Sequence, residues 1–152
     1  VGMAMAAKSD HKMYRVFVVL GDGECQEGEV WEAAQAANKY QLDNLVVIVD
    51  ENHLQLDGTT EEVMPNLDLQ AKFAAFGFET FGVDGHNMEE ILAVLDKART
   101  AKNGRPKCIV AQTVKGKGIS FMENRCDWHG TAPNESQYRQ AMQELDAQLD
   151  AI

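Results

Sequence analysis

Continuous apolar runs alternate along the chain with segments in which apolar residues recur at helical spacing. The continuous runs are rich in β-branched residues and predict buried strands, whereas the helical spacing predicts amphipathic helices. The expected strands are residues 14–20, 45–49, 78–83 and 108–113. The expected helices are residues 29–40, 68–76, 87–102 and 134–149, the last two opened by the capping residues Asn87 and Asn134.

This alternation determines the expected fold class. Strands that are apolar on both faces and alternate with helices are typical of a parallel sheet covered on both sides. We therefore expect an α/β, doubly wound, mainly parallel sheet in a single domain, residues 1–152. Residues 1–8 resemble the last turns of a helix, without an initiator Met or an N-cap residue. We accordingly expect the domain to be N-terminally truncated, which would leave one sheet edge exposed.

Charge and composition narrow the classes of partner. Lys and Arg number 14 against 24 Asp and Glu, a formal net charge of −10, so we expect no binding to nucleic acid. No apolar run approaches the roughly 18 residues of a membrane helix, so we expect no membrane partner. The three cysteines, Cys25, Cys108 and Cys126, are far apart and form no CxxC pair. This pattern favours neither a zinc site nor a disulfide framework and predicts a reduced, cytoplasmic protein.

Chemically unusual segments follow each expected strand. They are residues 21–23, 50–53, 83–86 and 115–118, which combine glycines with acidic, amide, histidine or lysine side chains. Right-handed crossovers place the loops after parallel strands at one edge of the sheet, where ligands of such folds bind. We therefore expect the functional site at this edge.

Asp22 and Asn52 come just after two consecutive expected strands, one strand–helix–strand unit apart. If the strands are neighbours, a carboxylate and an amide oxygen can converge there, and hard oxygen ligands suit Mg²⁺ or Ca²⁺. Two side chains do not complete a cage, which is typical of Mg²⁺ carried by the phosphates of a ligand. The glycines beside Asp22 allow backbone N–H groups to approach a diphosphate.

A purely structural interpretation of these segments also exists. Gly-Asp-Gly is a common tight turn, and Asn52 is a common turn residue. Residues 50–61 do not form an EF-hand loop, because the sixth position is Gln55 where a glycine is required. Neither a GxxxxGK[ST] loop nor a GxGxxG fingerprint occurs.

Taken together, these motifs resemble those of the transketolase family. The segment LGDGECQEGEVWEAA (residues 20–34) and Asn52 at the end of an apolar strand resemble its thiamine diphosphate motif. DENHLQLDG (50–58), VDGH (83–86), TVKGKG (113–118) and WHG (128–130) match in the same order. The similarity spans nearly the whole chain and is greatest to the N-terminal subunit of split transketolases, in which the diphosphate-binding and pyrimidine-binding domains are separate chains.

The resemblance implies a set of cofactor ligands. The Asp22 carboxylate, the Asn52 side chain and the backbone carbonyl of Leu54 would hold Mg²⁺, for which Ca²⁺ can substitute. Gly23 would contact the diphosphate of the thiamine cofactor.

The resemblance also implies roles outside the metal site. Lys115 would complement the diphosphate charge, and His129 would bind cofactor and substrate and transfer a proton at the sugar. Glu27 and Glu32 would lie at a dimer interface and couple two active sites. Without the resemblance, Lys115 is a solvated loop lysine, His129 a packed or capping histidine, and the glutamates favourable charges near a helix N-terminus. His53 and His86 are interpreted as loop residues.

The activity implied is a transketolase reaction. Thiamine supplies the nucleophilic carbon, and a two-carbon ketol unit passes from a ketose phosphate to an aldose phosphate. The resemblance implies a partner, the pyrimidine-binding C-terminal subunit, together with self-association and sugar phosphate substrates, and no catalysis by this chain alone. Two alternatives remain open: a noncatalytic or regulatory fragment that keeps the cofactor-binding fold, and a related thiamine enzyme acting on another ketose, such as a dihydroxyacetone- or apulose-phosphate transketolase.

Overall fold

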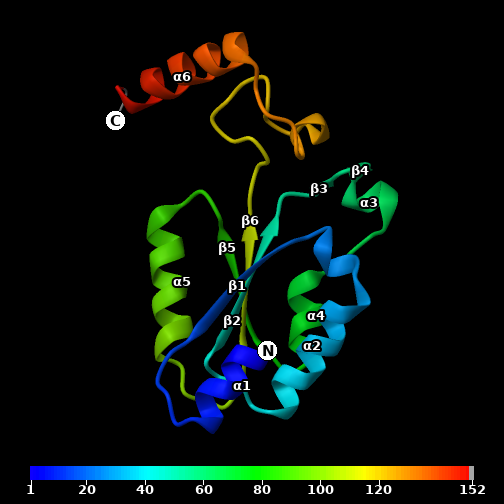
Figure 1. Cartoon of the computed structure of the whole chain (residues 1–152), viewed down its shortest axis with the longest axis vertical. Helices are drawn as coiled ribbons and strands as arrows, with labels where there is room; N and C mark the ends of the chain where they lie inside the picture. Colours follow the sequence, from blue (N-terminus) through cyan, green and yellow to red (C-terminus); the bar gives the residue numbers. More distant parts are fainter. Residues whose placement is uncertain (151–152) are drawn as a thin grey trace.

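A parallel sheet forms the centre of the computed structural model, which describes residues 1–150 (Figure 1). The strands are β1 (Val16–Gly21), β2 (Leu45–Glu51), β5 (Glu79–Asp84) and β6 (Lys107–Gln112), in the spatial order β1-β2-β6-β5. Each neighbouring pair in this sheet runs parallel. The predicted mainly parallel α/β sheet is therefore confirmed, and the carboxyl ends of its strands lie at one edge.

Helices cover both faces of the sheet, as predicted. Helices α2 and α4 lie on one face and α5 on the other (Figure 1). The helices are α1 (Gly2–Ser9), α2 (Gly28–Lys39), α3 (Thr60–Val63), α4 (Leu69–Ala75), α5 (Met88–Thr100) and α6 (Glu135–Leu149). The Asn134 side chain caps α6 in a complete capping box with Gln137. Asn87 caps α5 without a complete box, because the Glu90 carboxylate accepts from the Asp84 N–H and not from the Asn87 N–H.

Several short elements lie outside the sequence expectations. After β2 the chain forms a two-stranded hairpin of β3 (Leu54–Gln55) and β4 (Gly58–Thr59), and 3₁₀ turns occupy Glu24–Gln26 and Cys126–Trp128. Two-residue strands and single turns carry no hydrophobic period, so sequence patterning does not detect them.

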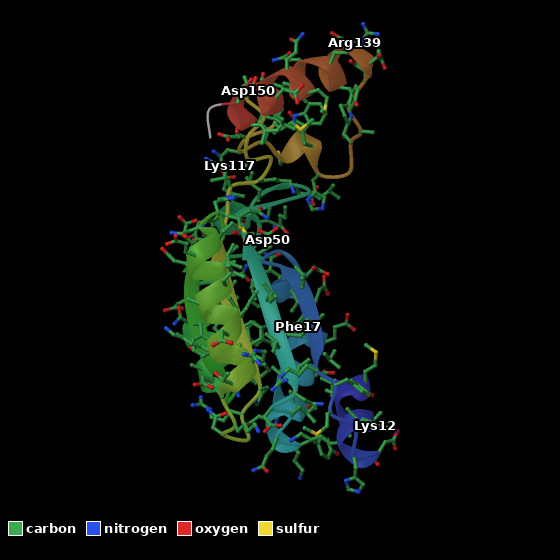
Figure 2. The ribbon with its side chains drawn as sticks, turned by 90° about the vertical axis from the view of Figure 1, so that its left-hand side faces the viewer. Lys12, Phe17, Asp50, Lys117, Arg139 and Asp150 are labelled. Carbon is green, nitrogen blue, oxygen red and sulfur yellow. The ribbon has the colours of Figure 1, made fainter. Side chains whose placement is uncertain are left out.

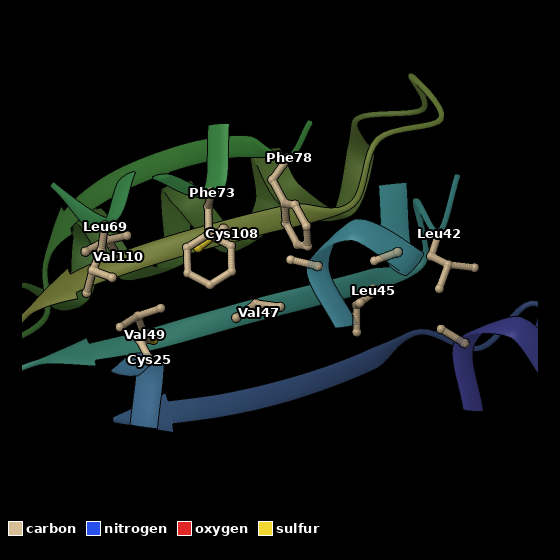
Figure 3. Close-up of a cluster of buried hydrophobic side chains, with 13 residues drawn as sticks. Cys25, Leu42, Leu45, Val47, Val49, Leu69, Phe73, Phe78, Cys108 and Val110 are labelled. Atoms are coloured by element: carbon tan, nitrogen blue, oxygen red, sulfur yellow. The ribbon is translucent and has the colours of Figure 1, made fainter. Parts of the chain in front are cut away.

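The main core lies between β2, β6 and the α2–α4 layer. Phe73 from α4 and Phe78 pack edge to face with ring centroids 5.3 Å apart, and Trp31 from α2 lies 5.0 Å from Phe73. Figure 3 shows Phe73 and Phe78 directed at the sheet, across from Val47 of β2. This aromatic cluster fixes α2, and with it the loop that joins β1 to α2.

Two of the three cysteines belong to this core. Cys25 and Cys108 are fully buried and free, and burial is the largest cause that raises the pKa of each thiol, to about 12 for Cys25. Both remain neutral near pH 7, which excludes Cys25 as a thiolate nucleophile even though it lies within the first motif.

The expectation that the first strand is covered on both faces is wrong. Within residues 1–150, β1 pairs only with β2, and three of its apolar side chains are exposed: Phe17 by 53%, Val18 by 36% and Val19 by 66%. The apolar pattern of β1 is that of a central strand, but its position is that of an edge strand. In the described sheet β1 and β5 are the two edge strands.

Helix α6 lies beyond the carboxyl edge of the sheet, apart from the two helical layers (Figure 1). Its only buried residue is Ala141. It is attached to the preceding loop by Glu144, which accepts hydrogen bonds from the Ser120 backbone N–H and hydroxyl, and by Gln148, which donates to the Gly118 carbonyl. The backbone bond from Ser120 is the main cause that lowers the pKa of Glu144.

Among the helices that the structure describes, none combines the length and apolar character needed to cross a bilayer.

The aromatic cluster generates a stability prediction. Phe73→Ala leaves a cavity beneath α2 and should lower the free energy of unfolding by about 3–5 kcal/mol, measured by urea denaturation. Leu92→Ala is the control, because this side chain on α5 is 63% exposed and its removal should change the free energy by less than about 0.5 kcal/mol. Equal effects of the two substitutions would contradict the assigned core.

Candidate functional site

Asp22 joins the loop after β1 to the loop after β2. Its backbone N–H donates to the Asp50 carbonyl at 3.1 Å, which continues the β1–β2 pairing past Gly21. Its side-chain Oδ2 accepts from the His53 N–H at 2.6 Å, and Oδ1 accepts from the Gly23 N–H at 2.9 Å. The structure thus brings together the two loops that carry Asp22 and Asn52, because β1 and β2 are neighbours.

The Asp22 carboxylate is only 1% exposed and has no cationic partner among residues 1–150. Desolvation is the largest effect on this group and raises its pKa, while the backbone N–H groups of His53 and Gly23 act in the opposite direction. A buried carboxylate with no charge partner favours binding of a cation. The site therefore fits a metal ion on electrostatic grounds.

Asn52 and Leu54 supply the other two predicted metal ligands. Asn52 Oδ1 accepts from the Leu54 N–H at 3.0 Å and so closes an Asx turn directly after β2. The turn keeps the amide oxygen within the same loop that His53 attaches to Asp22. Together with the Leu54 carbonyl, the available ligands are all hard oxygens, the set that Mg²⁺ and Ca²⁺ prefer.

Side chains of this site alone do not complete a metal cage. The described residues contain no group of three or more His, Cys, Asp or Glu side chains that could hold an ion. Because Mg²⁺ requires about six oxygen ligands, the remainder must come from water or from a bound ligand.

The second motif glycine lies against the β3–β4 hairpin. A Cβ placed on Gly23 would come within 3.1 Å of both Cβ and Oε1 of Gln55, so a larger residue would displace that side chain. The Gln55 Nε2 atom is buried and has no hydrogen-bond partner within the described chain. An unsatisfied buried donor beside a closely packed glycine fits a ligand that brings acceptor oxygens, as a diphosphate does.

A cavity of about 340 Å³ adjoins the Asp22 loop. Its walls include Asp22, His53, Thr60 and Asn66. It is thus bounded by the loops at the carboxyl edge, where ligands bind in open α/β sheets.

Lys115 and His129 come together above the same edge. Lys115 Nζ lies 3.1 Å from His129 Nδ1, across the loop that follows β6. This loop is tied to the site because Thr113 donates from its N–H to the Glu51 carbonyl and from its hydroxyl to Asp50. Lys115 is half-buried and His129 is exposed, so the contact between them lies at the surface of the loop.

The histidine is presented by a packed tryptophan. Trp128 donates from Nε1 to the Phe121 carbonyl at 2.9 Å, and the two rings pack at an interplanar angle of 58° with centroids 5.3 Å apart. Trp128 therefore packs this segment against Phe121, and the neighbouring His129 ring is left facing solvent.

Glu27 and Glu32 both lie in the first half of the α2 segment, and both are exposed. Neither side chain makes a hydrogen bond or ion pair within residues 1–150, and Glu27 occupies the N-cap position without capping through its side chain. Their side chains are free for intermolecular contact, and the predicted interface role stays a prediction.

Asn66 supports the site, although no sequence motif singles it out. It is 7% exposed and donates from Nδ2 to the Asp22 carbonyl at 2.7 Å, while its own carbonyl accepts from Lys72 Nζ at 3.2 Å. The Lys72 ammonium lies 4.7 Å from the Trp31 ring centroid, and Trp31 Nε1 donates to the Cys25 carbonyl. The Asp22 loop is thus fixed to the aromatic core from two sides.

A parallel α/β sheet with a buried acidic loop at its carboxyl edge has the arrangement with which open α/β folds bind ligands. The family comparison makes this specific: residues 3–150 match the family described as "Transketolase, thiamine diphosphate binding domain". The chain belongs to this family, and the family resemblance inferred from the motifs is confirmed.

Curated relatives share sequence over the whole chain. It is 42% identical over 152 residues to one of the subunits of the apulose-4-phosphate transketolase of Phocaeicola vulgatus, which corresponds to 54% of that protein. It is 40% identical over 146 residues to the 6-deoxy-6-sulfo-D-fructose transketolase subunit SqwG of a Clostridium species, or 53% of that protein. The chain therefore spans about half the length of these relatives.

Longer transketolases match in sequence and in structure. The chain is 38% identical to human transketolase over 152 residues, which is 24% of that protein. It superimposes on the crystal structure of transketolase from Campylobacter jejuni with a TM-score of 0.86 and 32% identity, covering 94% of this chain and 23% of the other. The fold observed here is thus that of a part of transketolase.

The Asn66 contacts generate a prediction. Asn66→Ala leaves the Asp22 carbonyl without its buried donor and should lower the free energy of unfolding by about 1–3 kcal/mol, measured by urea denaturation. Asn38→Ala is the matched control, because Asn38 is exposed on α2 and its side chain makes no hydrogen bond within the described residues. An Asn66 variant as stable as the Asn38 variant would refute this anchoring role.

Proposed function

We propose that this chain supplies the Mg²⁺–diphosphate half of a thiamine diphosphate-dependent transketolase active site. The reaction is transfer of a two-carbon ketol unit from a ketose phosphate to an aldose phosphate. The observation that carries the proposal is the Asp22 carboxylate, which is buried without a cation and bridges two loop tips at the edge where such folds bind ligands. Family membership supports the cofactor assignment.

Four positions would hold the metal and the diphosphate. The Asp22 carboxylate, the Asn52 amide oxygen and the Leu54 carbonyl would bind Mg²⁺, and Ca²⁺ fits the same oxygens. Gly23 would let the diphosphate approach the backbone, and Gln55 Nε2 would donate to it. When bound, the thiamine ring supplies the nucleophilic carbon for ketol transfer.

The Lys115–His129 pair would act on the anionic and polar groups above the metal. An ammonium has donors only, so a Lys115 contact at Nδ1 makes that nitrogen the acceptor and puts the neutral imidazole proton on Nε2. His129 could then donate from Nε2 to a substrate oxygen and transfer that proton. Lys115 would add positive charge beside the diphosphate.

The proposed partner is a pyrimidine-binding transketolase C-terminal subunit. The support is the length covered in the relatives: about half of proteins named as subunits, but about a quarter of human transketolase. We also propose self-association, with Glu27 and Glu32 at the interface, and a cytoplasmic location consistent with three free cysteines.

The ketose remains open within the proposal. The relatives' names specify apulose-4-phosphate in one case and 6-deoxy-6-sulfo-D-fructose in another, both ketoses with an anionic group. These names favour an anionic ketose over a neutral one. They also support the alternative that this chain belongs to a thiamine enzyme whose ketose is not one of the usual sugar phosphates.

Removing the metal ligand tests the cofactor site. In the wild-type chain, Mg²⁺ with thiamine diphosphate should raise the melting temperature, because a ligand that binds only the folded state stabilises it. At a hundredfold excess over Kd, the free energy of unfolding should rise by roughly 2.7 kcal/mol. Asp22→Ala should abolish this shift and the heat of binding in calorimetry. Asp146→Ala, which removes an exposed carboxylate on α6, should keep both. Unchanged binding in the Asp22 variant would rule out the metal assignment.

Replacing the histidine tests the catalytic role. His129→Ala should reduce thiamine-dependent turnover by about 10²–10⁴-fold in the complex reconstituted with a pyrimidine-binding partner, because a proton donor at the substrate is lost. Cofactor binding, followed by calorimetry, should persist. A near-normal rate would disprove the role, and a wild-type complex that binds cofactor without turnover would favour the noncatalytic alternative.

A further inference from the structure

We propose that His86 is a positioning residue that holds the Lys115 loop in place over the site. The proposal rests on the function proposed above for Lys115, but the anchoring itself is a separate structural claim. The sequence alone indicates only an ordinary loop residue at His86, and the proposed chemistry gives it no role.

The central observation is a hydrogen bond between two loops. The backbone N–H of Val114 donates to His86 Nε2 at 2.8 Å, joining the loop after β5 to the loop after β6. Val114 directly precedes Lys115 in the chain. The imidazole therefore fixes the backbone one residue before the lysine whose ammonium lies 3.1 Å from His129 Nδ1.

The β5 loop is itself held firmly, so it can act as an anchor. The Gly85 N–H donates to the Gln112 carbonyl at 2.8 Å, and Asp84 Oδ1 accepts from the His86 N–H at 2.9 Å. Glu90 in the first turn of α5 accepts from the Asp84 N–H at 3.2 Å. Strand β6, the Asp84 turn and helix α5 thus fix the backbone at His86.

Gly85 is required for this approach. A Cβ at Gly85 would lie 2.4 Å from Thr113 Cγ2 and 2.9 Å from the Gln112 carbonyl oxygen, both too close for any side chain. The glycine thus lets the loop pack directly against the end of β6, which places the next residue, His86, beside Val114.

The lysine loop needs an external anchor because of its composition. Gly116 and Gly118 have φ angles of +74° and +93°, in the region where glycine has little steric penalty but large conformational freedom. Past Lys115 the loop is held by the bond from the Asn124 N–H to the Lys115 carbonyl at 3.0 Å. On the side before Lys115, the His86 bond to Val114 extends the restraint that begins with the bonds from Thr113 to Glu51 and Asp50.

The hydrogen bond determines what the histidine must supply. Val114 N–H is a donor, so His86 Nε2 has to be an unprotonated acceptor, with the ring proton on Nδ1. A glutamine can offer its Oε1 at similar reach, whereas leucine fills similar space without an acceptor. His86→Gln and His86→Leu therefore separate the hydrogen bond from packing.

The first measurement is amide hydrogen exchange in the full chain. His86→Leu should speed exchange of the Val114 amide by about two- to tenfold, as expected for loss of one hydrogen bond, and His86→Gln should restore most of the protection. Exchange of core amides in β2 should not change, which shows that the variant is folded. Unchanged Val114 exchange in a folded His86→Leu variant would overturn the anchoring.

The second measurement is kinetic and uses the reconstituted complex. His86→Leu should raise the KM for thiamine diphosphate by about two- to tenfold with kcat nearly unchanged, and His86→Gln should behave like the wild type. In a Lys115→Met background the same change should have little further effect, because His86 acts through Lys115. Additive effects, or an unchanged KM in His86→Leu, would overturn positioning through the lysine.

The two measurements test different claims, so one can fail while the other succeeds. If the wild-type complex shows no thiamine-dependent activity, the proposed function is wrong, and the link from His86 to the cofactor falls with it. The exchange result for Val114 then still decides whether His86 anchors the loop.

Discussion

One buried carboxylate holds the loops of the candidate site together. Asp22 bridges the ends of β1 and β2 by accepting backbone N–H groups from both loops, and it does so almost entirely out of contact with water. Desolvating a charge is costly, and the hydrogen bonds offset only part of this cost. A divalent cation at this carboxylate would supply the missing charge, so the same group that closes the loops also favours metal binding.

The strand order makes this arrangement possible. Because β1 and β2 are parallel neighbours in register, their following loops start side by side, and the Asp50 carbonyl accepts directly from the Asp22 N–H. Strand β6 lies next to β2 on its other side, so the loop carrying Lys115 begins beside Glu51. Three loops that are distant in sequence thereby share one edge, with Asn66 and the aromatic core supporting them from below.

The two edge strands of the sheet differ in how well they are covered. Strand β5 and helix α5 are well packed, whereas β1 leaves Phe17 and Val19 exposed. Beyond the sheet edge, Figure 2 shows Asp50 at the end of β2, Lys117 in the loop above it, and α6 farther out with Arg139 and Asp150.

The sequence by itself determined the fold class, the main strands and helices, and the loops that meet at the carboxyl edge of the sheet. It could do so because hydrophobic period and short motifs are local properties of the chain. Only the tertiary structure decided that β1 is an exposed edge, that Asn66 reaches Asp22 from 44 residues away, and that His86 meets Val114 across 28 residues. Such contacts depend on strand order and on how closely loops approach, which no local pattern encodes.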